Sequence, residues 1–225
     1  MLQFSIGADH DTLELLRPLF PEGFDRPPAG MNSKFAHCYV LNDVGMVLRF
    51  LRRRSEAIKA FASLLKICLN ERDFTNAWLV TTCLGGVFLD DNQLARSALA
   101  SNKALHLAEV LEDNEHLAGA YRPLMLSYLG SGHLTEAEWM YEAFSRLPTP
   151  QNRAIYRPGD AEVWPCRLRF HQGRLTDQRL DEALAVAESS RNRFQIVELH
   201  SLRGELTLAC GDFDGASPAS NEQSR

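Results

Sequence analysis

The sequence lacks the short motifs that mark the commonest nucleotide-binding and metal-dependent enzymes. It has no GxxxxGK[ST] phosphate loop, no C-x-x-C pair and no H-E-x-x-H helix. Their absence argues against a P-loop ATPase and against a zinc site, so we expect no cofactor and no metal. No run approaches the 18 apolar residues of a membrane-spanning helix. The first residues carry no basic segment followed by an apolar one, so we also expect no signal peptide.

Strand signals, excess charge and paired cysteines are scarce as well. No sustained alternation of apolar and polar residues occurs, which argues against a β fold. The net charge of −5 in 225 residues gives no reason to expect a nucleic-acid or membrane partner. Five cysteines without paired spacing indicate reduced thiols and a cytoplasmic location.

Helical hairpins are what the sequence does contain, most clearly in residues 124–148, LMLSYLGSGHLTEAEWMYEAFSRLP. Tyr128 is followed by a turn glycine at Gly132, a small residue at Ala137, further aromatic residues and a closing Pro148. The order of aromatic residue, turn glycine, alanine, aromatic residue and proline resembles the tetratricopeptide repeat. We therefore expect two antiparallel helices that approach closely at Ala137.

The same pattern recurs along the chain. A small or compact residue is followed three positions later by a larger residue at Gly45, Gly85 and Met125. These three positions are spaced 40 residues apart, and a further repeat is expected near Cys166. Gly204 begins the last unit. Since such hairpins bury their apolar faces only by stacking, the predicted fold is an all-α, right-handed α-solenoid of about five tetratricopeptide-like hairpins with a period near 40.

The domain boundaries follow from the breaks in this pattern. Residues 1–31 are predicted to form a helix and a loop that cap the first repeat. Residues 32–216 form the repeat domain, and 217–225 a disordered tail of small and polar residues. The glycines at 45, 85 and 204 lie inside predicted helices, which indicates close helix packing at each.

Several helix starts are predicted from residues that can cap a helix with their side chains. Asn32 or Ser33 would begin the first repeat, Asp73 the second, and Thr135 the second helix of the hairpin at 124–148. The prolines between 148 and 165 predict an irregular link between the third and fourth units.

Residues 39–61 and 198–216, with the 40-residue spacing, resemble the tetratricopeptide tail of bacterial signal-transduction ATPases. The resemblance extends over roughly residues 35–216 and implies a scaffold or sensor role in bacterial signalling. This chain departs from those proteins because it has no phosphate loop and stops inside its last repeat. It could therefore be a truncated sensor fragment of a larger regulatory ATPase.

A ligand-binding groove is predicted where the first helices of successive repeats line the concave face. Arginines among apolar residues there would suit a carboxylate, because the guanidinium group binds carboxylates in a bidentate manner. Ordinary solvated arginines, or a basic cluster at 49–54 that opposes the negative end of a helix dipole, are the alternatives. The predicted groove residues are Asn42, Arg49, Thr82, Arg122, Arg167 and Phe170.

The function predicted from these features is non-enzymatic binding of a protein or peptide partner. The alternative is a cysteine- or histidine-dependent enzyme on a helical-repeat shell, with Cys38 or His37 as the working group. The last helix is apolar on more than one face, so a homodimer through the C-terminal repeat is also predicted, with Leu202 and Leu206 in the interface. The three tryptophans are expected to pack between helices.

Overall fold

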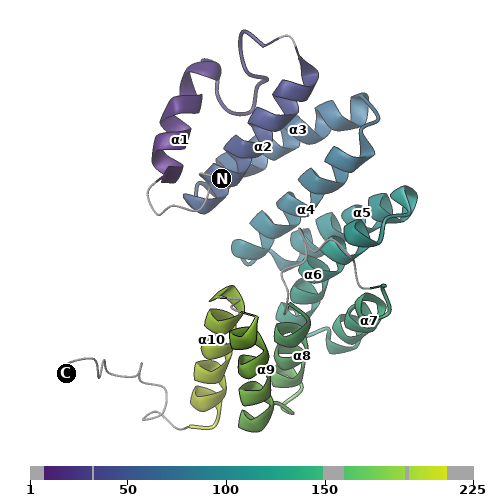
Figure 1. Cartoon of the computed structure of the whole chain (residues 1–225). Helices are drawn as coiled ribbons and strands as arrows, with labels where there is room; N and C mark the ends of the chain where they lie inside the picture. The colour runs from purple at the N-terminus through teal and green to yellow at the C-terminus, as the bar shows by residue number, and fades with distance from the viewer. Residues whose placement is uncertain (1–7, 32, 149–159, 191–192, 212–225) are drawn as a thin grey trace, which may run out of the picture.

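The structure is a computed structural model that describes residues 8–31, 33–148, 160–190 and 193–211. All regular secondary structure within these ranges is helical (Figure 1). The helices are α1 (Ala8–Leu16), the 3-10 turn η1 (Arg17–Leu19), α2 (Lys34–Phe50), α3 (Arg54–Asn70), α4 (Phe74–Asp90), α5 (Leu94–Leu111), α6 (Asn114–Gly130), α7 (Leu134–Ser145), α8 (Asp160–His171), α9 (Asp177–Ser189) and α10 (Arg193–Ala209). Within the described ranges, no helix is long and apolar enough to cross a membrane.

The helices from α2 to α7, and α8 and α9, are joined by short turns of one recurring geometry. The first or second residue after the helix end has a positive φ, and the next residue donates its N–H to the carbonyl five positions earlier, as Arg53 does to Leu48 at 2.8 Å. This is the Schellman arrangement, and it satisfies carbonyls that a helix end would leave unpaired. The positive-φ residues follow at intervals of 20 positions: Arg52, Arg72, Asn92, Glu112 and Gly132. Two such units make the 40-residue repeat.

Side chains cap several of these helices. Ser33 accepts a hydrogen bond from the backbone of Ala36, and Asp73 accepts one from Asn76, so both predicted caps are confirmed. The predicted cap of α7 is wrong, because the helix begins at Leu134 and His133 occupies the capping position without a side-chain bond. The Schellman bond from His133 to the carbonyl of Tyr128 fixes that boundary instead.

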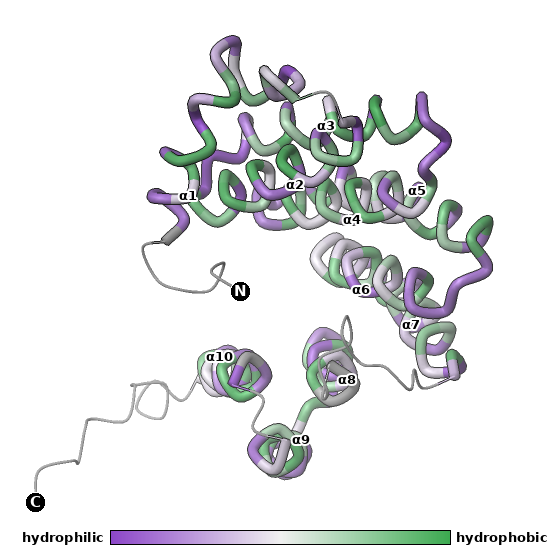
Figure 2. The backbone as a smooth tube through the Cα atoms, turned by 45° about the horizontal axis from the view of Figure 1, so that its top comes forward, coloured by the Kyte–Doolittle hydropathy of each residue, from purple (hydrophilic) through white to green (hydrophobic). Residues whose placement is uncertain are grey.

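The helices pair as α2 with α3, α4 with α5, α6 with α7 and α8 with α9, and α10 packs on α8 and α9. Within the described ranges, α2 also contacts α4, α4 contacts α6, and α8 contacts α10, whereas no comparable contact joins α3 to α5, α5 to α7 or α7 to α9. The first helices α2, α4 and α6 therefore form an inner layer, and α3, α5 and α7 an outer layer, while within the described ranges no comparable contact joins α6 to α8. In Figures 1 and 2, α8, α9 and α10 form one group and α1 through α7 another.

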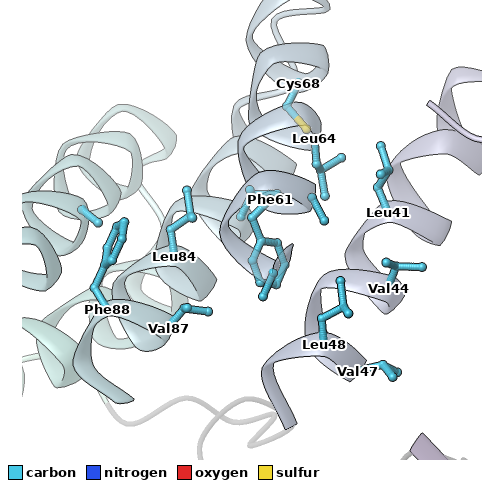
Figure 3. Close-up of a cluster of buried hydrophobic side chains, with 14 of the residues drawn as sticks. Leu41, Val44, Val47, Leu48, Phe61, Leu64, Cys68, Leu84, Val87 and Phe88 are labelled. Carbon is cyan, nitrogen blue, oxygen red and sulfur yellow. The ribbon is translucent and has the colours of Figure 1, made fainter. Parts of the chain in front are cut away.

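Two large clusters of buried apolar side chains hold the hairpins together. The first joins α1 through α5, and Figure 3 shows how Phe61 of α3 lies between Val44 of α2 and Leu84 of α4. At Gly45 an added Cβ would stand 2.6 Å from the Phe61 ring, so the predicted close approach is confirmed there. The second cluster joins α6 through α10 and includes Ala137, which has no exposed surface.

Two predictions about packing are wrong, those for Trp139 and Gly204, while the predicted interface at Leu202 and Leu206 stays a prediction. Trp78 and Trp164 are buried, but Trp139 on α7 is 60% exposed. Gly204 has no neighbour within 4 Å of the place where a Cβ would stand, because no second helix covers α10 there within the described residues. Leu202, a predicted interface residue, has no exposed surface and packs in the second cluster, where Leu206 also packs.

The exposed apolar side chains of α10 are instead Val197 and Leu208. A second chain that docked on this helix would meet those two residues. Helix α1 lies in the segment predicted to cap the first repeat. It contacts α2 and contributes the buried Leu13. The domain division at residues 31 and 32 stays a prediction, and the predicted tail at 217–225 lies outside the described residues.

Candidate binding face

One side of α2 presents a continuous stripe of side chains on the inner layer. Phe35, Tyr39, Asn42, Met46 and Arg49 recur every three or four residues and so share one face of the helix. Phe35 is 77% exposed and Tyr39 64%. The opposite face of α2 carries the residues buried in the first core cluster. We call the stripe, together with the adjoining residues Leu79, Thr82 and Gly86 of α4, the inner face.

Contacts between α2 and α4 fix the register of the inner face. The Cys83 thiol lies 3.8 Å from the Met46 sulfur. The Oδ1 atom of Asn42 and the Oγ1 atom of Thr82 are both buried without a hydrogen-bond partner. An unsatisfied buried polar atom costs about 1–3 kcal/mol, so a ligand that let these side chains turn outward and bond would recover part of that cost.

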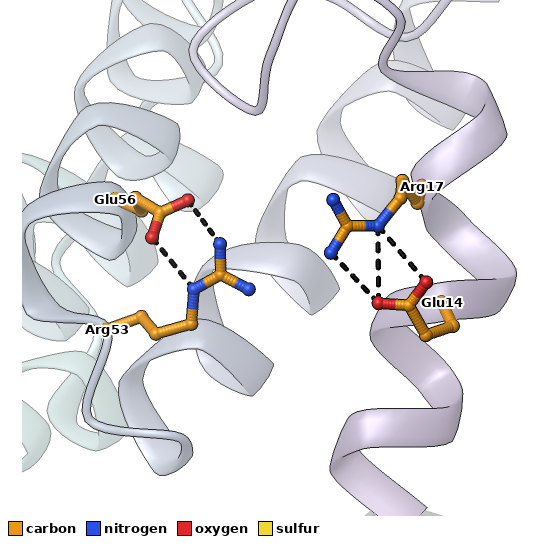
Figure 4. Close-up of polar contacts among 4 residues, drawn as sticks. All are labelled: Glu14, Arg17, Arg53 and Glu56. Carbon is orange, nitrogen blue, oxygen red and sulfur yellow. Dashed lines mark hydrogen bonds and ion pairs between the residues drawn. The ribbon is translucent and has the colours of Figure 1, made fainter.

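The arginines at the end of α2 are engaged by carboxylates. Arg49 Nε donates to Asp90 Oδ2 of α4 at 2.6 Å, and Arg54 pairs with Asp91 at 3.0 Å. Arg53 donates two hydrogen bonds to the Glu56 carboxylate, from Nε at 2.7 Å and from Nη2 at 2.6 Å (Figure 4). This bidentate contact raises the pKa of Arg53. From the sequence, these arginines were expected either to oppose the negative end of a helix dipole or to bind an anionic ligand. In the structure, Arg49, Arg53 and Arg54 form ion pairs with carboxylates of the same chain.

The ion pair in Figure 4 between Glu14 and Arg17 on α1 is of the same local kind. Exposed pairs of this type contribute little to stability, about 0–1 kcal/mol. The pair between Arg49 and Asp90 differs, because it joins two helices of the inner layer and because the side chain of Arg49 is only 25% exposed.

The remaining predicted groove residues lie further along the solenoid. Arg122 of α6 is 3.6 Å from Glu198 of α10, an ion pair between the two helix groups. Phe170 of α8 is partly buried and packs against the second core cluster. Burial lowers the pKa of His171, and the charge of Arg167 acts in the same direction. The six predicted residues thus divide into a set on α2 and α4 and a set on α6 and α8.

The residues of the alternative catalytic hypothesis, His37 and Cys38, lie in the first turns of α2. The imidazole Nε2 of His37 lies 2.9 Å from the Met31 carbonyl. Burial raises the pKa of the Cys38 thiol, and that of its neighbour Cys68 rises to about 12. Nucleophilic cysteines need a lowered pKa, and the shifts of these two thiols run in the opposite direction. Across the described ranges, no group of three or more His, Cys, Asp or Glu residues could hold a metal ion.

A small open depression of about 240 Å³ lies between α7 and α8. Its lining includes Glu138, Tyr141, Glu142 and Arg169. Glu142 is already paired with Arg146 at 3.0 Å. Pockets for small molecules are usually about 300–1,000 Å³ and mostly apolar, so this depression is a weaker candidate than the inner face.

Sequence reasoning named Asn42, Arg49 and Thr82, which belong to the inner face, but missed Phe35 and Tyr39. The same spacing, continued backward from Asn42 by three and then four residues, reaches both aromatics. It also missed Gly86. An added Cβ there would stand 2.6 Å from Nη1 of Arg49, so the guanidinium lies directly against the α4 backbone.

No protein-family model and no curated protein matches the sequence. Among solved structures, the chain is similar to a Rap protein complexed with Competence and Sporulation Factor, with a TM-score of 0.62 and 16% sequence identity. The similarity covers 83% of this chain and 52% of the Rap protein, so the chain spans about half the length of that structure. At this identity the likeness concerns the fold.

The predicted fold class is thereby confirmed: the chain is an all-α solenoid of tetratricopeptide-like helical hairpins. The resemblance to the tail of signal-transduction ATPases finds no support in these comparisons and stays a hypothesis.

Proposed function

We propose that this chain is a non-enzymatic helical-repeat module that binds a protein or peptide segment on its inner face, as a scaffold or sensor in bacterial signalling. The observation that carries the proposal is the stripe on α2, where Phe35 and Tyr39 are 77% and 64% exposed in line with Asn42. In a larger signalling protein, the same face would serve as the sensor part.

Exposed aromatic side chains in line with part-buried polar groups are what a polypeptide partner requires. Aromatic residues dominate the energetics of protein interfaces, because each buries a large area with few rotatable bonds. Asn42 and Thr82 supply oxygen atoms that could accept hydrogen bonds from the backbone of a partner. The Rap protein of similar fold was solved in complex with Competence and Sporulation Factor, which is consistent with binding as the use of such a fold.

The test is selection of a random linear peptide library, displayed on phage, against the immobilised chain. Peptides that bind should lose affinity by about tenfold or more with Phe35→Ser or Tyr39→Ser, the loss expected when a central aromatic contact is removed. Trp139→Ser is the matched control, because Trp139 is 60% exposed on the outer-layer helix α7. If no peptide is selected, or if all selected peptides bind both inner-face variants normally, the proposal is wrong.

A further inference from the structure

Both ends of the stripe on α2 are closed by ion pairs within the chain. At the beginning of α2, Lys34 pairs with Glu71, which follows the end of α3. At the other end, Arg49 pairs with Asp90. The formal charges on the stripe are therefore neutralised before any ligand arrives.

The pair between Arg49 and Asp90 is held by two features of α4. Gly86 has no side chain, which leaves the place that the Arg49 guanidinium occupies, since an added Cβ would stand 2.8 Å from its Cζ atom. Asp90 and Asp91 are at the C-terminal end of α4, where the helix dipole disfavours negative charge. A cation from α2 offsets that unfavourable position, so Asp90 has reason to retain Arg49 as its partner.

The side chains of the inner face between these pairs carry no formal charge. They include two exposed aromatic rings, Phe35 and Tyr39, the part-exposed Met46, and the neutral residues Leu79 and Thr82 of α4. A charged side chain of a ligand that bound here would lose hydration without finding a free countercharge, and that loss is costly.

We infer that the segment bound by the inner face of α2 and α4 is a polypeptide whose contacting side chains are apolar and uncharged. The inference rests on the proposed function and adds the chemistry of the ligand to it. It replaces the acidic ligand that the arginines suggested from the sequence, because Arg49 already has its carboxylate within the chain.

The peptide selection tests this inference when the composition and salt dependence of the binders are measured. Binders that depend on Tyr39 should be depleted of Asp, Glu, Lys and Arg, and their Kd should change by less than about twofold between about 50 and about 500 mM salt, since screening acts on exposed charges. Acidic binders whose affinity falls about tenfold over that range would overturn the inference while leaving the proposed function intact. Absence of binders that depend on the inner face would instead overturn the proposed function.

A charge variant gives a second, independent readout. Asp90→Asn removes the partner of Arg49, so selection on this variant should enrich peptides with Asp or Glu. Asp91→Asn is the matched control, because it removes the partner of Arg54 instead and should leave the selected peptides uncharged. Circular dichroism verifies that both variants keep their helicity. If Asp90→Asn selects the same uncharged peptides as the original chain, the internal ion pair is not what sets ligand charge, and the inference is wrong.

Discussion

The first two hairpins, α2 through α5, and the last helices, α8 through α10, are built from the same repeat but differ in how tightly they are packed. At Gly45 and Gly85 an added Cβ would stand 2.6 Å from Phe61 and 2.8 Å from Ser101, whereas Gly204, at the corresponding place in α10, has open space around it. A small residue in the same register is thus a packing requirement in one region and has no packing role in the other. The repeat pattern specifies where a helix can be approached, while the presence of the approaching helix decides whether the residue matters.

The turns differ between the two regions as well. The turns as far as α6 place Arg52, Arg72, Asn92 and Glu112 at positive φ, between 51° and 58°, whereas the later ones use Gly132, Gly173 and Gly211. A residue with a Cβ is disfavoured in this conformation by about 1–2 kcal/mol. The tightly packed hairpins therefore tolerate backbone strain at their turns, while the later units avoid it with glycine.

The largest effect is expected for a charge introduced on the buried side of α10. Leu202→Glu places a carboxylate where no surface is exposed, and an uncompensated buried charge costs about 3–5 kcal/mol. Val197→Glu on the same helix, at a site that is 68% exposed, should change the free energy of unfolding by less than about 0.5 kcal/mol. Urea unfolding followed by circular dichroism measures both. Equal effects would show that α10 is rotated relative to this structure.

The difference between the glycines is tested directly by a pair of alanine variants. Gly45→Ala should destabilise the chain by about 1–2 kcal/mol, because the clash with Phe61 outweighs the better helix propensity of alanine. Gly204→Ala should stabilise it by about 0.5–1 kcal/mol, since propensity acts there without a clash. Urea unfolding of the two variants gives both signs in one experiment. A destabilising Gly204→Ala would reveal a further segment packed against Gly204 itself.

The turns should respond with opposite signs to substitution at equivalent positions. Glu112→Gly relieves strain at a φ of 51° and should stabilise by about 0.5–1 kcal/mol. Gly132→Ala introduces that strain at a φ of 77° and should destabilise by about 1 kcal/mol. Thermal unfolding of both variants is the measurement. If Glu112→Gly lowers the melting temperature, then the Glu112 side chain makes a stabilising contact that outweighs the strain.

The smallest effect concerns the pH dependence of the C-terminal helices. Burial, and secondarily Arg167, lowers the pKa of His171 below its ordinary 6.5, while Glu205 acts in the opposite direction. The unfolded chain therefore binds a proton more readily than the folded one, so the contribution of His171 to stability should be lost as pH falls below about 6.5. His171→Gln should flatten this slope, as urea unfolding at about pH 5 and about pH 8 would show.

Much of the fold could be predicted because its information is local. The helices of the hairpin at 124–148 and the caps at Ser33 and Asp73 follow from residues within a few positions of each other. The 20-residue spacing of the turns could not be recognised from the sequence. Four of the five positive-φ residues in these turns are Arg, Asn or Glu, whereas glycine is the usual sign of such a turn. The prolines predict that the irregular link extends to Pro165, but this residue lies inside α8, whose first helical residue is Asp160.

Stacked helical hairpins, and the common helix face of Asn42, Met46 and Arg49, follow from the sequence alone. Helical periodicity is a property of neighbouring residues, so it needs no knowledge of the rest of the fold. Other features required the folded chain: Arg49 is neutralised by Asp90, 41 positions away, Arg122 meets Glu198, and Leu202 is buried while Gly204 is open. These facts depend on how the superhelix brings distant hairpins together, and a side chain's charge partner or neighbour is set by that placement rather than by spacing along the chain.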